Sequence, residues 1–187
     1  MSPTTLPAPI PRRYEPANIA AVADITYSTG DSRLGTILIA RSDVGVCAIL
    51  LGDDGDDLVD DLASRFPGSF LKADGTALRD ELAKVVQFID SPRTPLDFAL
   101  DMRGTPFQRR VWNALRAIPA GTTINYTELA RRVGDLKAVR AVASACASNP
   151  IALAVPCHRV VRSDGDLAGY RWGIERKRAL LALEVRK

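Results

Sequence analysis

The chain has 187 residues, which suits one large domain or two small ones packed together, and its hydrophobic content of 47% is ordinary for a globular protein. No apolar run reaches the roughly 18 residues that a membrane-spanning helix needs, so the sequence predicts no membrane partner. The net charge of +3 is unevenly divided. Residues 1–103 hold 10 Lys and Arg against 16 Asp and Glu (net −6), whereas residues 104–187 hold 15 against 6 (net +9). This asymmetry favours a polyanion, such as nucleic acid, as the partner of the second half, with a basic surface that binds nothing as the alternative.

The cysteine content points to a reducing compartment. There are three cysteines and no CxxC pair, which is typical of a cytoplasmic protein without disulfides. Three dispersed cysteines and a single histidine do not supply a tetrahedral metal site, so we expect no bound metal. Residues 1–19 are rich in proline and lack an apolar block, which predicts a disordered or loosely attached tail rather than a secretory signal.

Residues 20–103 read as a small sheet with helices. Short alternating runs at 20–27, 36–40 and 44–51 predict strands, with a hairpin turn at 41–43. The acidic stretch 52–57 predicts a turn and the start of a helix. A calcium loop is the alternative for that stretch, but it lacks the glutamate that such a loop needs at its twelfth position.

Two amphipathic helices should cover this sheet. Apolar residues recur at helical spacing from Leu58 to Phe66 and again from Leu78 to Ile89. After a proline-containing break at 91–95, residues 96–101 alternate like an edge strand. We place a boundary near Arg103, so that 20–103 forms an α/β structural subdomain and 104–187 a mainly helical one.

The second half begins with three predicted helices. Thr105 and Pro106 form a helix start, and the apolar face that follows ends before Gly121. Thr127 is the predicted cap of a second helix that Gly134 stops, and 136–147 is the third helix. Two short helices around a glycine-containing break have helix-turn-helix spacing, although an ordinary helical hairpin has the same pattern.

The third predicted helix carries almost only small side chains. A helix that reads base edges in the major groove needs long hydrogen-bonding side chains, and this one offers Lys137, Arg140 and a few hydroxyls. We therefore expect contact with double-stranded DNA through shape and backbone, with little sequence preference, in the minor groove.

The only histidine stands beside a cysteine. Residues 151–155 predict a short buried strand that ends at Pro156, followed by Cys157 and His158. Histidine is suited to accept the proton of a thiol near neutral pH, and Arg159 would favour the thiolate or another anion. A Cys-His dipeptide is more often structural. Because neighbours on a regular element point to different faces, direct contact needs a sharp turn or a bridging water.

The segment 156–161, Pro-Cys-His-Arg-Val-Val, resembles the active-site signature of the O6-alkylguanine-DNA alkyltransferases. From Tyr27 to Glu184 the chain is similar to the carboxy-terminal half of the bacterial Ada proteins and their free-standing relatives. The resemblance implies an α/β amino-terminal subdomain, a helical DNA-binding subdomain with a helix-turn-helix, and a monomer without cofactor. The implied reaction is irreversible, single-turnover transfer of an alkyl group from O6-alkylguanine, and also from O4-alkylthymine, to Cys157.

The resemblance also assigns roles residue by residue. Cys157 is the alkyl acceptor, His158 its water-bridged base, and Glu184 the carboxylate that orients the histidine. The remaining matches bind DNA or the base turned out of the helix. Tyr126 matches the tyrosine at the flanking phosphate, Arg140 the arginine finger, and Asn149 the asparagine that ties the recognition helix to the active site. Val160 matches the residue whose carbonyl accepts from guanine, and Tyr170 and Arg171 lie in the alkyl-pocket loop.

Three other functions fit parts of the pattern. A non-catalytic lesion-binding protein on the same scaffold would lack Cys157, a Cys-His-Glu hydrolase would have no use for the basic half, and a plain transcription regulator would need base-reading side chains. The zinc module of full-length Ada is absent from this sequence, so phosphotriester repair and regulation of transcription are not expected.

Overall fold

The computed structural model describes residues 24–92, 95–167 and 169–185. The predicted tail at 1–19 and the start of the predicted strand at 20–27 lie outside these ranges. Within them, no helix is long and apolar enough to cross a membrane, and no group of His, Cys, Asp and Glu side chains could hold a metal ion.

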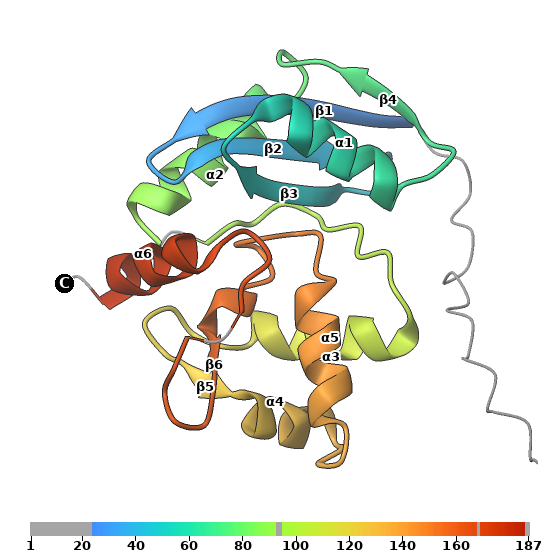
Figure 1. Cartoon of the computed structure of the whole chain (residues 1–187). Helices are drawn as coiled ribbons and strands as arrows, with labels where there is room; N and C mark the ends of the chain where they lie inside the picture. Colours follow the sequence, from blue (N-terminus) through green and yellow to red (C-terminus); the bar gives the residue numbers. More distant parts are fainter. Residues whose placement is uncertain (1–23, 93–94, 168, 186–187) are drawn as a thin grey trace, which may run out of the picture.

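The first half is built on a four-stranded sheet in the order β3-β2-β1-β4 (Figure 1). β1 (Asp24–Ser32), β2 (Gly35–Arg41) and β3 (Val46–Gly52) form an antiparallel meander, and β4 (Phe70–Ala73) joins β1 in parallel. β2 and β3 are almost continuously apolar because both of their faces are buried. The predicted strands and the hairpin between them are confirmed, whereas β4 was not predicted.

α1 (Gly55–Arg65) and α2 (Arg79–Asp90) cover opposite faces of the sheet (Figure 1). Both were predicted. The strands come close to the helices at two glycines: a methyl group at Gly52 or at Gly30 would lie 2.9 Å from a leucine side chain of α1 or of α2. Asp54 caps α1 by accepting hydrogen bonds from two backbone N–H groups of the first turn.

Residues 96–101 do not form the predicted edge strand. They run along β3 and make one bridge, between Val46 and Leu100, flanked by hydrogen bonds from the Val46 N–H to the Ala99 carbonyl and from the Asp101 N–H to the Val46 carbonyl. The alternating pattern reflects one side resting on the sheet. This segment covers part of the β3 edge and leads into the helical half.

The second half contains α3 (Pro106–Arg116), α4 (Tyr126–Val133) and α5 (Val139–Ala147), which pack on one another (Figure 1). The Trp112 indole N–H donates to the Ala145 carbonyl at 2.8 Å and ties α3 to α5. α4 and α5 are joined by a short turn that starts at Gly134, which has a φ of 87°. The arrangement of a mixed sheet with helices followed by a mainly helical half agrees with the predicted fold class.

Two helix starts differ from the prediction. The cap of α4 is Asn125, whose side-chain oxygen accepts from the Glu128 N–H, and not Thr127. The third helix begins at Val139 and not at 136, because residues 135–138 form the turn between α4 and α5. The predicted start of α3 is confirmed, and Gln108 completes a capping box with Thr105.

Candidate active site

The Cys-His pair lies on one turn of 3-10 helix, η1 (Cys157–Arg159), which leads into β6 (Val160–Val161). The preceding strand predicted at 151–155 is wrong. Ile151 makes a single bridge with Ile49 of β3, and the chain then turns with Leu153 at a φ of 69°, a conformation that non-glycine residues seldom adopt. The chain therefore turns sharply three residues before Pro156, and the pair itself lies on the turn of η1.

Asn149 holds this turn in place. Its side chain is buried, accepts from the Ile151 N–H at 2.9 Å and donates to the Val155 carbonyl at 2.8 Å. The same amide nitrogen lies 3.4 Å from the Cys157 sulfur and donates to it. One side chain thus connects the end of α5, the turn and the thiol.

His158 and Glu184 form a buried pair. The His158 Nε2 lies 2.8 Å from Glu184 Oε1, and both side chains are fully buried. Glu184 comes from α6 (Ile174–Val185) and also accepts from the Gly121 N–H at 3.0 Å. Because a carboxylate receives the Nε2 proton, the lone pair of His158 is on Nδ1. This nitrogen is buried and bonded to none of the described residues.

Of the two partners expected for Arg159, the thiolate or another anion, the structure shows the second. Its guanidinium donates to both oxygens of Glu184, with the shortest contact at 2.8 Å from Nη2 to Oε1, and to the Ile118 carbonyl. Its anionic partner is therefore the glutamate rather than the thiolate of Cys157. This bidentate ion pair fixes the position of the Glu184 carboxylate, which in turn fixes the imidazole of His158.

The environment sets the protonation state of each group. Burial raises the pKa of the Cys157 thiol to about 11, although the hydrogen bond from Asn149 and the charge of Lys177 oppose this rise. Burial also lowers the pKa of His158, which Glu184 offsets only in part. Burial acts against ionisation of Glu184, but the hydrogen bonds from His158 and Arg159 outweigh it and lower its pKa to about 2. At neutral pH the arrangement holds a thiol, a neutral imidazole and a carboxylate.

Three further predicted residues border the thiol. Val160 pairs with Ile124 of β5 (Ile124–Asn125), which places Tyr126, the first residue of α4, beside β6. Tyr126 is half-buried, and burial raises its pKa to about 12, so its hydroxyl stays a donor. The Tyr170 hydroxyl is buried and makes no hydrogen bond with the described residues.

The other two predicted residues point elsewhere. Arg140 lies near the start of α5 and is exposed. Arg171 forms an ion pair with Asp61 of α1, at 2.6 Å, and is partly exposed. The structure therefore gathers seven of the nine predicted residues around η1 and leaves Arg140 and Arg171 on the surface.

Sequence reasoning missed two contributors. The role of Arg159 and the presence of the buried Lys177 both depend on α6 folding back over η1. The spacing held one signal for Lys177. It precedes Glu184 by seven residues, which is about two helical turns and hence the same face.

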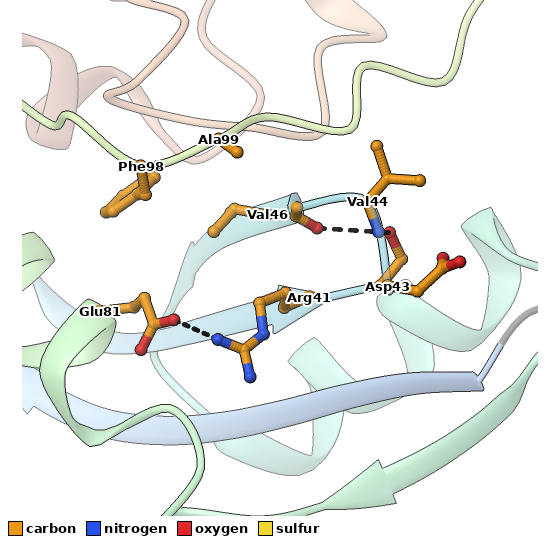
Figure 2. A pocket seen from close by; sticks show the side chains of 9 residues that line it. Arg41, Asp43, Val44, Val46, Glu81, Phe98 and Ala99 are labelled. Atoms are coloured by element: carbon orange, nitrogen blue, oxygen red, sulfur yellow. Dashed lines mark hydrogen bonds and ion pairs between the residues drawn. The ribbon is translucent and has the colours of Figure 1, made fainter.

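The structure also has a cavity of about 380 Å³ far along the chain from the thiol, at the turn between β2 and β3 (Figure 2). Its lining includes an Arg41–Glu81 ion pair at 2.5 Å, with Phe98 opposite. None of the predicted site residues lines it. The chemistry-bearing groups are concentrated around η1 instead.

Comparison with known proteins identifies the family. A model of the 6-O-methylguanine DNA methyltransferase DNA-binding domain matches residues 106–186. A methylated-DNA–protein-cysteine methyltransferase of Mycolicibacterium paratuberculosis is 38% identical over 162 residues, which cover 87% of this chain and 93% of that protein. The chain belongs to the O6-methylguanine-DNA methyltransferase family. All the predicted site residues lie within the matched 106–186 range.

Solved structures of the methyltransferase family agree with this. The chain resembles the Mycobacterium tuberculosis OGT crystallised with DNA, with a TM-score of 0.71, 38% identity, and coverage of 86% of this chain and 92% of that one. It is also 48% identical to the Ada protein of Escherichia coli K12, described as a bifunctional transcriptional activator and DNA repair enzyme, over 86% of this chain. The chain spans 46% of the length of that Ada protein.

Proposed function

We propose that this protein repairs DNA by moving an alkyl group from the O6 atom of guanine, and from the O4 atom of thymine, to Cys157. The observation that carries the proposal is the buried chain of contacts from Asn149 to Cys157 and from His158 to Glu184 and Arg159. A thiol with a raised pKa needs a base, and the neutral imidazole next to it is that base. The names of its relatives in this family support the same reaction.

The bonds change as follows. The Cys157 proton passes to His158 Nδ1 through a bridging water, while Glu184 stabilises the imidazolium that forms. The sulfur attacks the alkyl carbon, the S–C bond forms and the C–O6 bond breaks. The electron pair stays on guanine, where a hydrogen-bond donor, the Tyr126 hydroxyl or the loop backbone, stabilises the developing negative charge. The departing base then takes up, through solvent, the proton that Cys157 gave to His158. The thioether product is stable, so each molecule reacts once.

DNA binding follows from the second half. We infer that α4 and α5 form a helix-turn-helix that enters the minor groove, with the small side chains of α5 against the backbone and little preference for sequence. The damaged base must leave the stack to reach a buried thiol, and Arg140 on the exposed surface of α5 fills the space it leaves. The Val160 carbonyl and the loop with Tyr170 and Arg171 then hold the base. We propose that the protein acts as a monomer, as the family resemblance implies.

The proposal is tested by incubating the protein with a duplex that contains one O6-methylguanine and mapping the modified peptide by mass spectrometry. We expect a gain of one CH₂ on the peptide of Cys157, at most one methyl group per chain, and no transfer with Cys157→Ser. Cys146→Ser is the matched control, because this thiol is also buried but lies on α5, and it should keep the activity. Modification of another peptide, or repeated turnover, would refute the assignment.

A further inference from the structure

Lys177 is a buried cation that the reaction described above does not use. The side chain is 0% exposed and lies in α6. Its ammonium donates to the Val160 carbonyl at 2.6 Å. Among the described residues Lys177 forms no ion pair, and Glu184 of the same helix pairs instead with His158 and Arg159. Burial of a charge without a counter-ion is costly, so a lysine at this position calls for an explanation.

The helix geometry ties Lys177 to the active site. Lys177 and Glu184 are separated by about two turns of α6 and so share one face, with the buried Leu180 between them. Glu184 contacts His158 and Arg159, whereas Lys177 contacts Val160. One face of α6 therefore contacts His158 and Arg159 of η1 as well as Val160, the first residue of β6.

The charges near Cys157 do not balance while its thiol is protonated. Arg159 and Glu184 compensate each other, and His158 is neutral, which leaves the positive charge of Lys177. Ionisation of Cys157 with loss of its proton to solvent, as in the resting protein, would bring the buried group to zero net charge. Burial lowers the pKa of Lys177, and the neighbouring thiols act in the opposite direction, so the surroundings of this ammonium favour an anion close by.

Other titratable groups face this pair from several elements. Those near Lys177 are a cysteine of α5 and an aspartate of the loop before α6, and those near Cys157 are two tyrosines, that is, Cys146, Asp166, Tyr126 and Tyr170. The pKa values of both tyrosines are raised mainly by burial, so they are uncharged at neutral pH. Asp166 is exposed, which weakens its effect through solvent screening. Lys177 remains the buried cation available to a thiolate.

We propose that Lys177 is a positioning residue: held by its hydrogen bond to the Val160 carbonyl, it stabilises the thiolate of Cys157 electrostatically. The lysine does not need to touch the substrate. Its charge acts through the low-dielectric interior, where it is stronger than in water. The inference deepens the proposed alkyl transfer, but the thiolate itself can be measured without DNA.

The test is the pH dependence of Cys157 alkylation by iodoacetamide, followed peptide by peptide with mass spectrometry so that Cys47 and Cys146 do not interfere. In Lys177→Met we expect the reactivity of Cys157 at a fixed pH near neutrality, where the lysine is charged, to fall by about tenfold, which is equivalent to a rise of about one unit in the pKa of its thiol. Lys177→Gln, which keeps a donor for the Val160 carbonyl but no charge, should behave in the same way. Lys177→Arg should restore much of the reactivity.

The outcomes separate charge from structure. Equal Cys157 profiles in wild type and in both neutral variants would overturn the proposal. The proposal would also be overturned if Cys157 became less reactive in Lys177→Met but kept its wild-type reactivity in Lys177→Gln. The hydrogen bond to the Val160 carbonyl, rather than the charge, would then matter. If neither neutral variant folds, as judged by circular dichroism, Lys177 has a structural role and the proposal is wrong. If the neutral variants show the expected loss of Cys157 reactivity but the wild-type protein does not take up methyl from DNA, the proposed function is refuted and this inference stands.

Discussion

Glu184 is the residue on which the geometry of the site converges. Its two oxygens receive His158, Arg159 and the Gly121 N–H, and the side chain is buried. A carboxylate in this position both chooses the tautomer of the histidine and compensates the charge of the arginine. Removing its charge should therefore affect rate and stability together.

Glu184→Gln should lower the rate of methyl transfer by about 100-fold, the usual contribution of a positioned general base. It should also reduce the free energy of unfolding by about 3 kcal/mol, because Arg159 stays buried without its partner. Glu175→Gln is the matched control on the same helix, since Glu175 is exposed and, among the described residues, forms an ion pair with Arg178 alone. Single-turnover kinetics and urea unfolding measure the two effects. An unchanged rate in Glu184→Gln would contradict the role given to His158.

Acid stability should depend on the same carboxylate. The folded-state pKa of Glu184 is about 2, below its ordinary value of 4.5. A depressed pKa means that the unfolded state takes up the proton first, so the contribution is complete above pH 4.5 and is lost as the pH falls towards 2. Unfolding free energies measured across this window should fall more steeply in wild type than in Glu184→Gln. Parallel curves would show that other carboxylates account for the acid sensitivity.

For single residues, the sequence predicted the active site where the reacting groups are neighbours along the chain. Cys157 and His158 are adjacent, and the rare pairing of a thiol with the only histidine was visible at once. Glu184 was found only through the family resemblance, since a glutamate in a terminal helix is ordinarily exposed. The partner of Arg159 and the burial of Lys177 could not be read from the sequence, because both depend on where α6 docks.

Among the elements, α4 depends on a cap that differs from the one predicted. The side chain of Asn125 accepts from the Glu128 N–H at 2.8 Å. Asn125→Ala should reduce the free energy of unfolding by about 1 kcal/mol, a typical loss for an N-cap. Thr127→Ala, at the exposed residue first taken as the cap, should change it by less than about 0.5 kcal/mol. Chemical denaturation of the two variants decides between the caps, and a larger loss in Thr127→Ala would contradict the structure.

The periodic elements were predictable, and the irregular ones were not. β2, β3, α1 and α2 have strong apolar patterns and were recognised with small errors at their ends. The segment 151–155 is just as apolar but turns instead of extending, because Asn149 satisfies its backbone groups from within. A side chain that replaces a neighbouring strand as hydrogen-bond partner leaves no periodic signal.

The two halves of the molecule are joined through arginines. Arg176 of α6 donates to the Leu34 carbonyl between β1 and β2, to the Trp172 carbonyl and to the Asp53 carboxylate. Arg171 of the same region pairs with Asp61 of α1. The sheet therefore supports the loop before α6, which carries Tyr170 towards the active site.

Arg176→Ala should reduce the free energy of unfolding by about 2 kcal/mol, because one mostly buried cation loses three hydrogen-bond acceptors. Arg178→Ala, two positions further on, removes an exposed ion pair with Glu175 and should cost less than about 1 kcal/mol. Differential scanning calorimetry of both variants provides the comparison. Equal melting temperatures would show that the hydrogen bonds of Arg176 contribute little to holding the sheet and the helical half together.

The overall division into a sheet half and a helical half was anticipated from the charge and the hydrophobic pattern. The sequence did not reveal how the halves meet. That contact joins residues more than a hundred positions apart, such as Arg176 with Leu34, and depends on the final packing.

The position of Glu184 in the last turn of α6 makes the active site depend on the integrity of that turn. Cleavage after Leu183 would leave the sulfur, the imidazole and nearly all of α6 in place, yet it would separate from them the residue that orients the imidazole. A preparation cleaved in this way would still titrate as a free thiol. Its low activity would be explained only by measuring the mass of the chain.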